Sequence, residues 1–530
     1  QTPWAEGQNV RHLEPLGFIK FDILGLSTLY LFERCIEKIL QRKGKKNISF
    51  EDIKEFYDEN LSVSKINFDD QEVYENVFHN SKWTGGIFQF SQKGVQQFCN
   101  EVKPRSIDEL AAVTSIYRPG PLSSKVDKQY VKAKNNPSGV NYEHPILREV
   151  LEKNYGLLIY QEDISTLTTR LGKDISPDEG QQFRKMLTKK GLGGKEAEVK
   201  KKIKKKFITG CREKGFTEAK AEKLYQEMEY FAQYSFSLNH AVPYAMTSYQ
   251  CAWLWTYYPE EWMASYLDFE SEDKKEIAVN IAKSFGFKIK GIDVNTSTDK
   301  WEISEDGKTL IQPMTSVKGF GDAAFKEIQS YRPFNTIEEF LFHPYMSYSK
   351  VNKKALDVLA RAGALNDLID DRFTGMKHFW SVIAVDRPRN EKKFLQNLEK
   401  YAPEGDFTEQ EKIDFITDLT GFFPLTKIVS DGMIQKLQNN GIAPISQYDP
   451  DLKYVWFIPR VVTEKMSSKG KKYFIVDVID STSTLTMIRC WSVREGETVE
   501  INRPYIASLD YDEQWGFSTR SITKNFRLIG

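Results

Sequence analysis

An acidic side chain lies inside an apolar stretch near the start of the chain. Residues 18–23 read Phe-Ile-Lys-Phe-Asp-Ile and predict a β-strand. A carboxylate such as that of Asp22 is costly in apolar surroundings unless it faces water, pairs with a cation or binds a metal ion. Lys20 lies two residues earlier, on the same face of the strand. The pair suits a salt bridge on a water-facing edge strand, which is the simpler interpretation, or a phosphate contact beside a metal ligand.

Positive charge is most concentrated between residues 183 and 206. Arg184, Lys185, Lys189 and Lys190 come first, and a run of lysines follows at 200–206. Such a stretch is either a solvated helix face or a surface that contacts the phosphates of DNA or of a nucleoside triphosphate. Spacing alone leaves both interpretations open.

Aromatic side chains are dense between residues 230 and 266. Most of them are expected in the hydrophobic core, because large aromatic side chains dominate core packing. Tyr234, His240 and Tyr244 lie beside polar residues and a proline instead. These three are candidates for stacking on a base or a sugar.

A glycine-rich turn precedes a predicted helix at residues 317–324, which read Val-Lys-Gly-Phe-Gly-Asp-Ala-Ala. Gly319 and Gly321 leave backbone N–H groups open to a DNA phosphate, and Lys318 lies beside them. The pattern is typical of a helix-hairpin-helix motif.

The elements that must position these residues are mostly helical. Ser27 is the predicted N-cap of a first helix through Leu31 and Ile39, and residues 50–270 are largely helical between Gly and Pro breaks. Residues 301–312 predict a hairpin turning at Asp306-Gly307. From Tyr454 onward the period changes to two, which predicts a small all-β domain compatible with a five-stranded oligonucleotide-binding barrel.

Composition limits the class of protein. At 530 residues the chain is too long for one hydrophobic core, so several domains are expected. Lys plus Arg and Asp plus Glu each number 74, so any nucleic-acid surface must come from local clustering of charge. Five scattered cysteines, none in a Cys-x-x-Cys pair, argue against a zinc finger or a disulfide framework and favour a reduced, cytoplasmic setting. The sequence shows neither a membrane-span pattern nor a secretory signal.

Read in order, the motifs resemble those of the C-family replicative DNA polymerases, the alpha subunit of bacterial polymerase III. The most specific are Ile-Tyr-Arg-Pro-Gly-Pro-Leu at 116–122 and Tyr-Gly-Leu-Leu-Ile-Tyr-Gln-Glu at 155–162. Lys-Phe-Asp-Ile-Leu-Gly-Leu at 20–26 resembles the palm strand with the third catalytic aspartate. Phe-Arg-Lys-Met at 183–186 resembles the segment that holds the incoming triphosphate, and the similarity continues through Gly-Phe-Phe-Pro-Leu-Thr at 421–426.

The resemblance implies a multidomain α+β fold with a largely helical fingers region, a helix-hairpin-helix region and a C-terminal β-barrel of oligonucleotide-binding type. The implied boundaries are the end of the palm at 1–40, the fingers at 41–285, a helix-hairpin-helix and clamp-binding-like region at 286–440 and the β domain at 441–530.

The implied reaction is template-directed DNA synthesis from deoxynucleoside triphosphates, with two Mg²⁺ ions that orient an in-line attack. Asp22 is the implied metal ligand, with Lys20 beside it in the catalytic site. The implied nucleotide contacts are Arg184, Lys185, Lys189, Lys190, His240 and Tyr244. The implied DNA contacts are Arg118, Lys318, Gly319 and Gly321, and the β domain is expected to follow the single-stranded template.

Two departures from the family pattern qualify this expectation. The family usually has Asn-Lys-Ser-His in the nucleotide pocket, whereas residues 237–240 read Ser-Leu-Asn-His, which lacks the lysine and keeps His240. The family's Asp-x-Asp pair would precede residue 22, so we expect either a truncated chain or a polymerase split between two polypeptides. Primer-template DNA and the N-terminal polymerase part are the expected partners, and a sliding clamp and other replisome subunits are further candidates. The rival hypothesis is a non-catalytic DNA-binding or scaffold subunit of a replisome.

Overall fold

The computed structural model describes most of the chain. The described residues are 17, 25–188, 194–271, 274–401, 405–421, 425–467, 470–481, 486–491, 493–494, 496–512 and 516–529. They fall into two compact units, one drawn from residues 1–81 and 86–256, the other from residues 82–85 and 257–530. None of the helices in this described part has the length and apolar character needed to cross a membrane.

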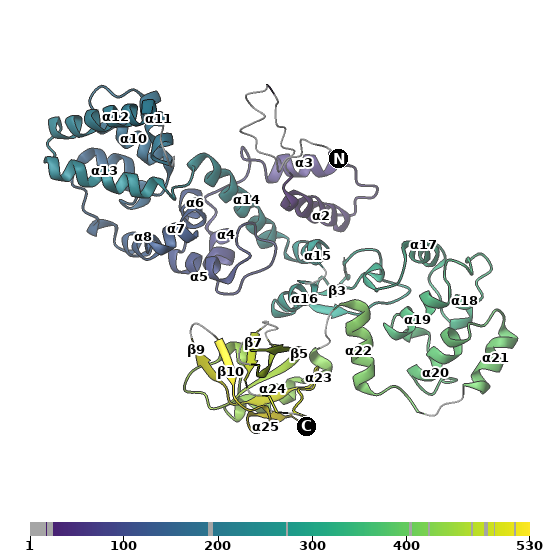
Figure 1. The fold of residues 1–530 in the computed structure, drawn as a ribbon. Helices are drawn as coiled ribbons and strands as arrows, with labels where there is room; N and C mark the ends of the chain where they lie inside the picture. Colours follow the sequence, from purple (N-terminus) through teal and green to yellow (C-terminus); the bar gives the residue numbers. More distant parts are fainter. Residues whose placement is uncertain are drawn as a thin grey trace. The chain divides into compact units, whose positions relative to one another are not determined.

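The first unit is helical (Figure 1). Its principal helices are α2 (Ser27–Arg42), α3 (Phe50–Asn60), α5 (Lys93–Val102), α6 (Ile107–Ile116), α7 (Pro119–Ser123), α8 (Val126–Asn135), α9 (Pro145–Leu151), α10 (Gln161–Leu171), α11 (Pro177–Thr188), α12 (Gly194–Glu213), α13 (Glu218–Ala232) and α14 (Leu238–Tyr257). The predicted first helix is confirmed, but the prediction that Ser27 caps it is wrong. Ser27 is already helical, and Leu26 occupies the N-cap without a side-chain hydrogen bond.

One core of the first unit lies among α9 to α13. Leu167 and Leu171 of α10, Phe183 of α11 and Phe207 of α12 are almost fully buried in it. Gly210 lets α12 approach the end of α10 closely, because a Cβ at this position would overlap the backbone of Gly172 and Lys173. The parts of the charged stretch at 183–188 and 194–206 are therefore carried by helices that also contribute buried side chains to this core.

The second unit begins with α15 (Pro259–Phe269) and α16 (Lys275–Ser284), followed by a three-stranded sheet. The predicted hairpin is confirmed: β2 (Glu302–Ile303) pairs antiparallel with β3 (Thr309–Ile311), and Gly307 has a positive φ of 67° in the turn. β1 (Lys288–Lys290) pairs parallel with the other edge of β3.

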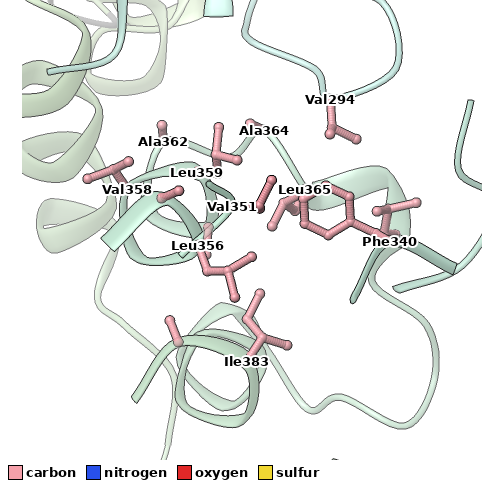
Figure 2. Close-up of a cluster of buried hydrophobic side chains, with 14 of the residues drawn as sticks. Val294, Phe340, Val351, Leu356, Val358, Leu359, Ala362, Ala364, Leu365 and Ile383 are labelled. Carbon is pink, nitrogen blue, oxygen red and sulfur yellow. The ribbon is translucent and has the colours of Figure 1, made fainter. Parts of the chain in front are cut away.

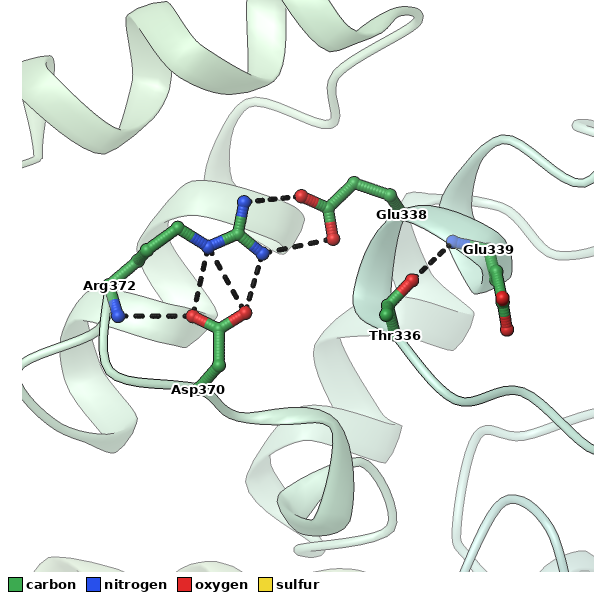
Figure 3. A network of polar contacts seen from close by, with 5 residues as sticks. All are labelled: Thr336, Glu338, Glu339, Asp370 and Arg372. Atoms are coloured by element: carbon green, nitrogen blue, oxygen red, sulfur yellow. Dashed lines mark hydrogen bonds and ion pairs between the residues drawn. The ribbon is translucent and has the colours of Figure 1, made fainter.

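A second helical region follows the small sheet. Its helices are α17 (Asp322–Tyr331), α18 (Ile337–Leu341), α19 (Lys353–Arg361), α20 (Met376–Trp380), α21 (Glu391–Lys400) and α22 (Glu409–Thr420). Figure 2 shows Leu356 and Leu359 of α19 packed among Phe340, Val351 and Ile383 in its core. Outside this core, Arg372 joins the start of α18 to the segment after α19, because its guanidinium donates to both Glu338 and Asp370 (Figure 3).

The C-terminal part is a curled β-sheet (Figure 1, yellow-green). The strands are β4 (Ala443–Pro444), β5 (Val455–Met466), β6 (Lys472–Ile479), β7 (Thr486–Cys490), β8 (Tyr505–Ala507), β9 (Asp510–Asp512), β10 (Gly516–Thr519) and β11 (Phe526–Leu528), with α23 (Leu425–Ile428) and α24 (Asp431–Asn439) before them and α25 (Ile522–Asn525) between β10 and β11. The described strands run in the order β11-β8-β5-β6-β7-β10-β9. The predicted α+β multidomain fold with a C-terminal β domain of oligonucleotide-binding type is confirmed.

Candidate nucleotide and DNA contacts

Four of the predicted site residues lie outside the described residues. They are Lys20, Asp22, Lys189 and Lys190. Among the residues that are described, no group of three or more His, Cys, Asp and Glu side chains could hold a metal ion.

The start of α14 is held by Tyr160, which precedes α10, and by Gln161 and Glu162, which open it. The backbone N–H of Gln161 donates to the carbonyl of Phe236 at 2.8 Å, and Tyr160 and Phe236 form a parallel β-bridge. The carboxylate of Glu162 accepts hydrogen bonds from the Ser237 hydroxyl at 2.9 Å and from the Leu238 N–H at 2.8 Å. A carboxylate at this position satisfies an otherwise open N–H and complements the positive end of the helix dipole.

His240 and Tyr244 lie one turn apart at this fixed end of α14. Their ring centroids are 4.0 Å apart, and the Phe88 ring meets Tyr244 edge-on at 5.0 Å. His240 also contacts the Phe236 ring at 5.3 Å, and its side chain is exposed. The result is a row of aromatic rings with one open end, which is suited to stacking against a base or a sugar.

Arg118 joins the same cluster from the start of α7. Its guanidinium lies 4.6 Å from the centroid of the Phe236 ring, in a cation–π arrangement. Pro119 occupies the first helical position after it, which suits the fixed φ of proline. Gly120 allows a close approach, because a Cβ there would lie 2.6 Å from the Cβ of Tyr234.

Arg184 reaches the cluster through Gln161. Its Nε donates to the Gln181 Oε1 at 3.0 Å, and its Nη1 donates to the Gln161 Oε1. Gln161 in turn donates its side-chain amide to the Ser235 carbonyl at 3.2 Å. The structure thus brings Arg118, Arg184, His240 and Tyr244 together around segment 235–238, whereas the side chain of Lys185 is exposed on α11.

The lysine run of α12 divides into two groups. Lys200, Lys204 and Lys206 form ion pairs with Glu229, Glu222 and Glu179 at 2.6, 2.9 and 2.7 Å. These three lysines join α12 to α13 and α11, which is a structural use of positive charge. Lys201, Lys202 and Lys205 are exposed on the helix.

The last residues of the motif at 155–162 have a structural role that the sequence pattern did not predict. Gln161 and Glu162 organise the cluster, and Asp163 holds the backbone before them by accepting from the N–H groups of Ile159 and Tyr160 at 3.2 and 2.9 Å. Burial raises the pKa of Asp163 to about 6. No local sequence signal shows that Glu162 would cap a helix that starts at residue 238.

The predicted helix-hairpin-helix turn has the expected backbone form. Gly319 has a φ of +85°, which favours glycine, and Gly321 occupies the N-cap of α17. The N–H of Lys318 donates to the Leu419 carbonyl at 2.7 Å, so α22 takes up that donor. The side chains of Lys318 and Lys354 remain exposed, and the Cε of Lys354 would lie 3.2 Å from a Cβ on Gly319.

The outer face of the β domain carries an aromatic pair, of which Tyr473 is half-buried and Trp491 is exposed. Tyr473 of β6 and Trp491 after β7 have ring centroids 4.9 Å apart and planes inclined by 32°. Strand register places Lys465 directly opposite Tyr473. Arg489 lies opposite Ile475 on the same outer face. Aromatic rings beside cations are the features with which such domains bind single strands.

Comparisons with known proteins identify two regions of the chain. Residues 47–215 match the family model described as the bacterial DNA polymerase III alpha subunit finger domain, and residues 286–374 match that of a helix-hairpin-helix motif. The DNA polymerase III subunit alpha of Aquifex aeolicus is 29% identical over 518 residues, which is 94% of this chain and 41% of that protein.

Two further relatives have the same name, DNA polymerase III subunit alpha. The corresponding subunits of Campylobacter jejuni and Thermus aquaticus are 31% and 30% identical, over 67% and 68% of this chain and 28% of each relative. The chain thus spans less than half the length of these relatives. The order of matched regions and the cover of nearly the whole chain agree with the motifs at 116–122, 155–162 and 317–324, and the chain belongs to the family of bacterial DNA polymerase III alpha subunits.

Proposed function

We propose that this chain takes part in template-directed DNA synthesis, as the part of a C-family DNA polymerase that binds the incoming nucleotide and grips the DNA. The observation that carries the proposal is the convergence of Arg118, Arg184, His240 and Tyr244 around segment 235–238. Two arginines and an open row of aromatic rings match the two ends of a nucleoside triphosphate, its phosphates and its base or sugar.

In this proposal the arginines act through electrostatics. Arg184 binds the β- or γ-phosphate and offsets charge that develops on the leaving pyrophosphate. Lys185, Lys189 and Lys190, which follow Arg184 in the sequence, add positive charge for the phosphates. His240 and Tyr244 hold the sugar or base in line for attack, and Arg118 contacts the template or the primer.

Catalysis also requires Mg²⁺, which prefers carboxylate oxygens. Asp22 is the proposed ligand in this chain, with Lys20 beside it, and the remaining aspartates come from the polymerase part that precedes residue 22. Two such ions would orient the attacking and leaving oxygens.

DNA contacts are proposed at two further places. The helix-hairpin-helix, through Lys318, Gly319 and Gly321, grips the duplex backbone without reading its sequence. The outer face of the β domain, with Tyr473 and Trp491, stacks bases of the single-stranded template. Primer-template DNA is therefore the principal partner, a sliding clamp and other replisome subunits are further partners, and the site of action is the cytoplasm.

The test is primer extension by an enzyme that contains this chain and the polymerase part with the remaining aspartates. Asp22→Asn should abolish extension and leave primer-template binding nearly unchanged. Extension within about threefold of the wild type would contradict the assignment of Asp22. A wild-type assembly that binds DNA and never extends a primer would instead support a non-catalytic subunit.

A further inference from the structure

The helix-hairpin-helix region contains arginines in two different electrostatic settings. Arg372 is neutralised by two carboxylates, those of Glu338 and Asp370 (Figure 3). Arg361 pairs with Asp357 at 2.6 Å. Arg387 and Arg389 differ from both, because no carboxylate among the described residues lies within ion-pair distance of either. The nearest acid in sequence, Asp386, pairs with Lys393 and Lys400.

Arg387 is buried without a charge partner. Its exposed fraction is 9%, its Nη1 donates to the Tyr348 carbonyl at 2.6 Å, and its buried Nε has no hydrogen-bond partner. Burial lowers the pKa of Arg387. A guanidinium held in this way is costly unless an anion reaches it, because a buried charge needs a partner of opposite sign.

Arg387 and Arg389 both lie against the ring of Tyr348. The guanidinium carbons of Arg387 and Arg389 lie 3.5 and 5.7 Å from the centroid of its ring. Tyr348 is 44% exposed, and Arg389 is exposed. The three residues form an arginine shelf, in which the ring orients the guanidinium groups and leaves part of the cluster open to a ligand.

We infer that the arginine shelf of Tyr348, Arg387 and Arg389 binds a phosphate of the DNA backbone. This inference rests on the proposed function and extends the DNA surface beyond the hairpin. Segment 348–354 leads from the shelf to Lys354, which lies against Gly319 of the hairpin. Lys350 within that segment and the backbone N–H of Ser347 just before it both donate to Glu327 of α17, at 2.7 Å each. A DNA backbone that follows the helix-hairpin-helix turn therefore meets Lys354 and then the arginine shelf along the same protein segment.

The experiment measures binding of a primer-template duplex to the full chain by fluorescence anisotropy over a series of salt concentrations. Arg389→Gln is the test variant because Arg389 is exposed, and Arg372→Gln is the matched control because its charge is already neutralised. Loss of one phosphate contact should lower the slope of log K against log salt by about 0.9. Arg389→Gln should show that change for duplexes of unrelated sequence, and Arg372→Gln should not.

The outcomes separate the shelf from the proposed function. If the wild type binds DNA and Lys318→Ala lowers its salt slope, but Arg389→Gln leaves the slope unchanged, the shelf is overturned and the hairpin contact stands. An unchanged slope in Arg389→Gln together with loss of binding to an acidic protein segment would assign the shelf to a protein partner and also overturn the inference. A wild-type chain that binds no DNA would refute both. Tyr348→Leu is a second test variant. Like Arg389→Gln, it should lower the affinity of the chain for the primer-template duplex.

Discussion

The contact between Glu162 and the start of α14 makes the proposed nucleotide site of Arg118, Arg184, His240 and Tyr244 depend on a residue 76 positions before Leu238. Glu162→Ala removes two hydrogen bonds to a carboxylate, from Ser237 at 2.9 Å and from Leu238 at 2.8 Å. Hydrogen bonds to charged groups contribute about 1.5–3 kcal/mol each. All three side chains are half-buried and water can replace part of the loss, so we expect a local cost of about 2–3 kcal/mol.

Hydrogen exchange is the appropriate assay, because a chain with two compact units need not unfold in a single two-state step. A local loss of about 2–3 kcal/mol should speed exchange of the first-turn amides of α14 by roughly 30- to 150-fold where exchange follows opening of that turn. Glu162→Gln should have a smaller effect because it keeps an acceptor oxygen and loses the charge. Exchange within about threefold of the wild type in Glu162→Ala would refute the capping role.

Ser49→Ala is a matched control. Ser49 caps α3 by accepting from the Asp52 N–H at 3.3 Å, in the same unit but at another helix. Its removal should cost about 1 kcal/mol in α3. Exchange at the start of α14 should not change in this variant, and a change there would show that the assay reports global opening.

Two further predictions concern the stability of the first unit. Burial raises the pKa of Glu109, but hydrogen bonds from Lys134, Tyr155 and the Arg105 N–H more than offset this effect, so the pKa is lowered. Because the folded pKa is depressed, this stabilisation is present above the ordinary value of 4.5 and is lost as the pH falls below it. The pKa of Lys134 is also lowered, by its own burial, which does not change its charge in acid. Denaturant titrations across this range should show a weaker loss of stability on acidification in Glu109→Gln, and an unchanged acid dependence would contradict the prediction. Gly210→Ala should destabilise the packing of α12 on α10 by about 1–3 kcal/mol or more, because the new Cβ overlaps backbone. Thermal unfolding can compare it with Gly194→Ala, whose Cβ meets open space and should leave the melting temperature nearly unchanged.

Short sequence patterns predicted the elements that are determined by residues close together in the chain. The Asp306-Gly307 turn and the alternating residues of β6 and β7 lead directly to the observed hairpin and strands. The two glycines of the helix-hairpin-helix turn were also predictable: Gly319 has a positive φ, and Gly321 precedes a helix. In each case the residues that define the element lie within a few positions of one another.

Contacts between distant segments were not predictable from those patterns. The parallel pairing of β1 with β3 joins strands separated by the β2 hairpin. The division of the α12 lysines depends on glutamates of α11 and α13, so the charge run alone could not show which lysines are paired. The capping of α14 by Glu162 likewise depends on tertiary packing. The roles of Arg118, Arg184, His240 and Tyr244 come from the resemblance to family motifs and stay predictions.

The most direct test of the nucleotide site is the dependence of single-nucleotide incorporation on triphosphate concentration in Arg184→Gln. The enzyme must contain this chain and the polymerase part with the remaining aspartates, and Arg212→Gln provides a control on an exposed arginine of α12 that pairs with Glu218. If Arg184 binds a triphosphate oxygen, loss of a charge-assisted hydrogen bond of about 1.5–3 kcal/mol should lower kcat/KM for the triphosphate by roughly 10- to 150-fold. Primer-template affinity should not change. A kcat/KM within about threefold of the wild type would contradict a nucleotide site at this cluster.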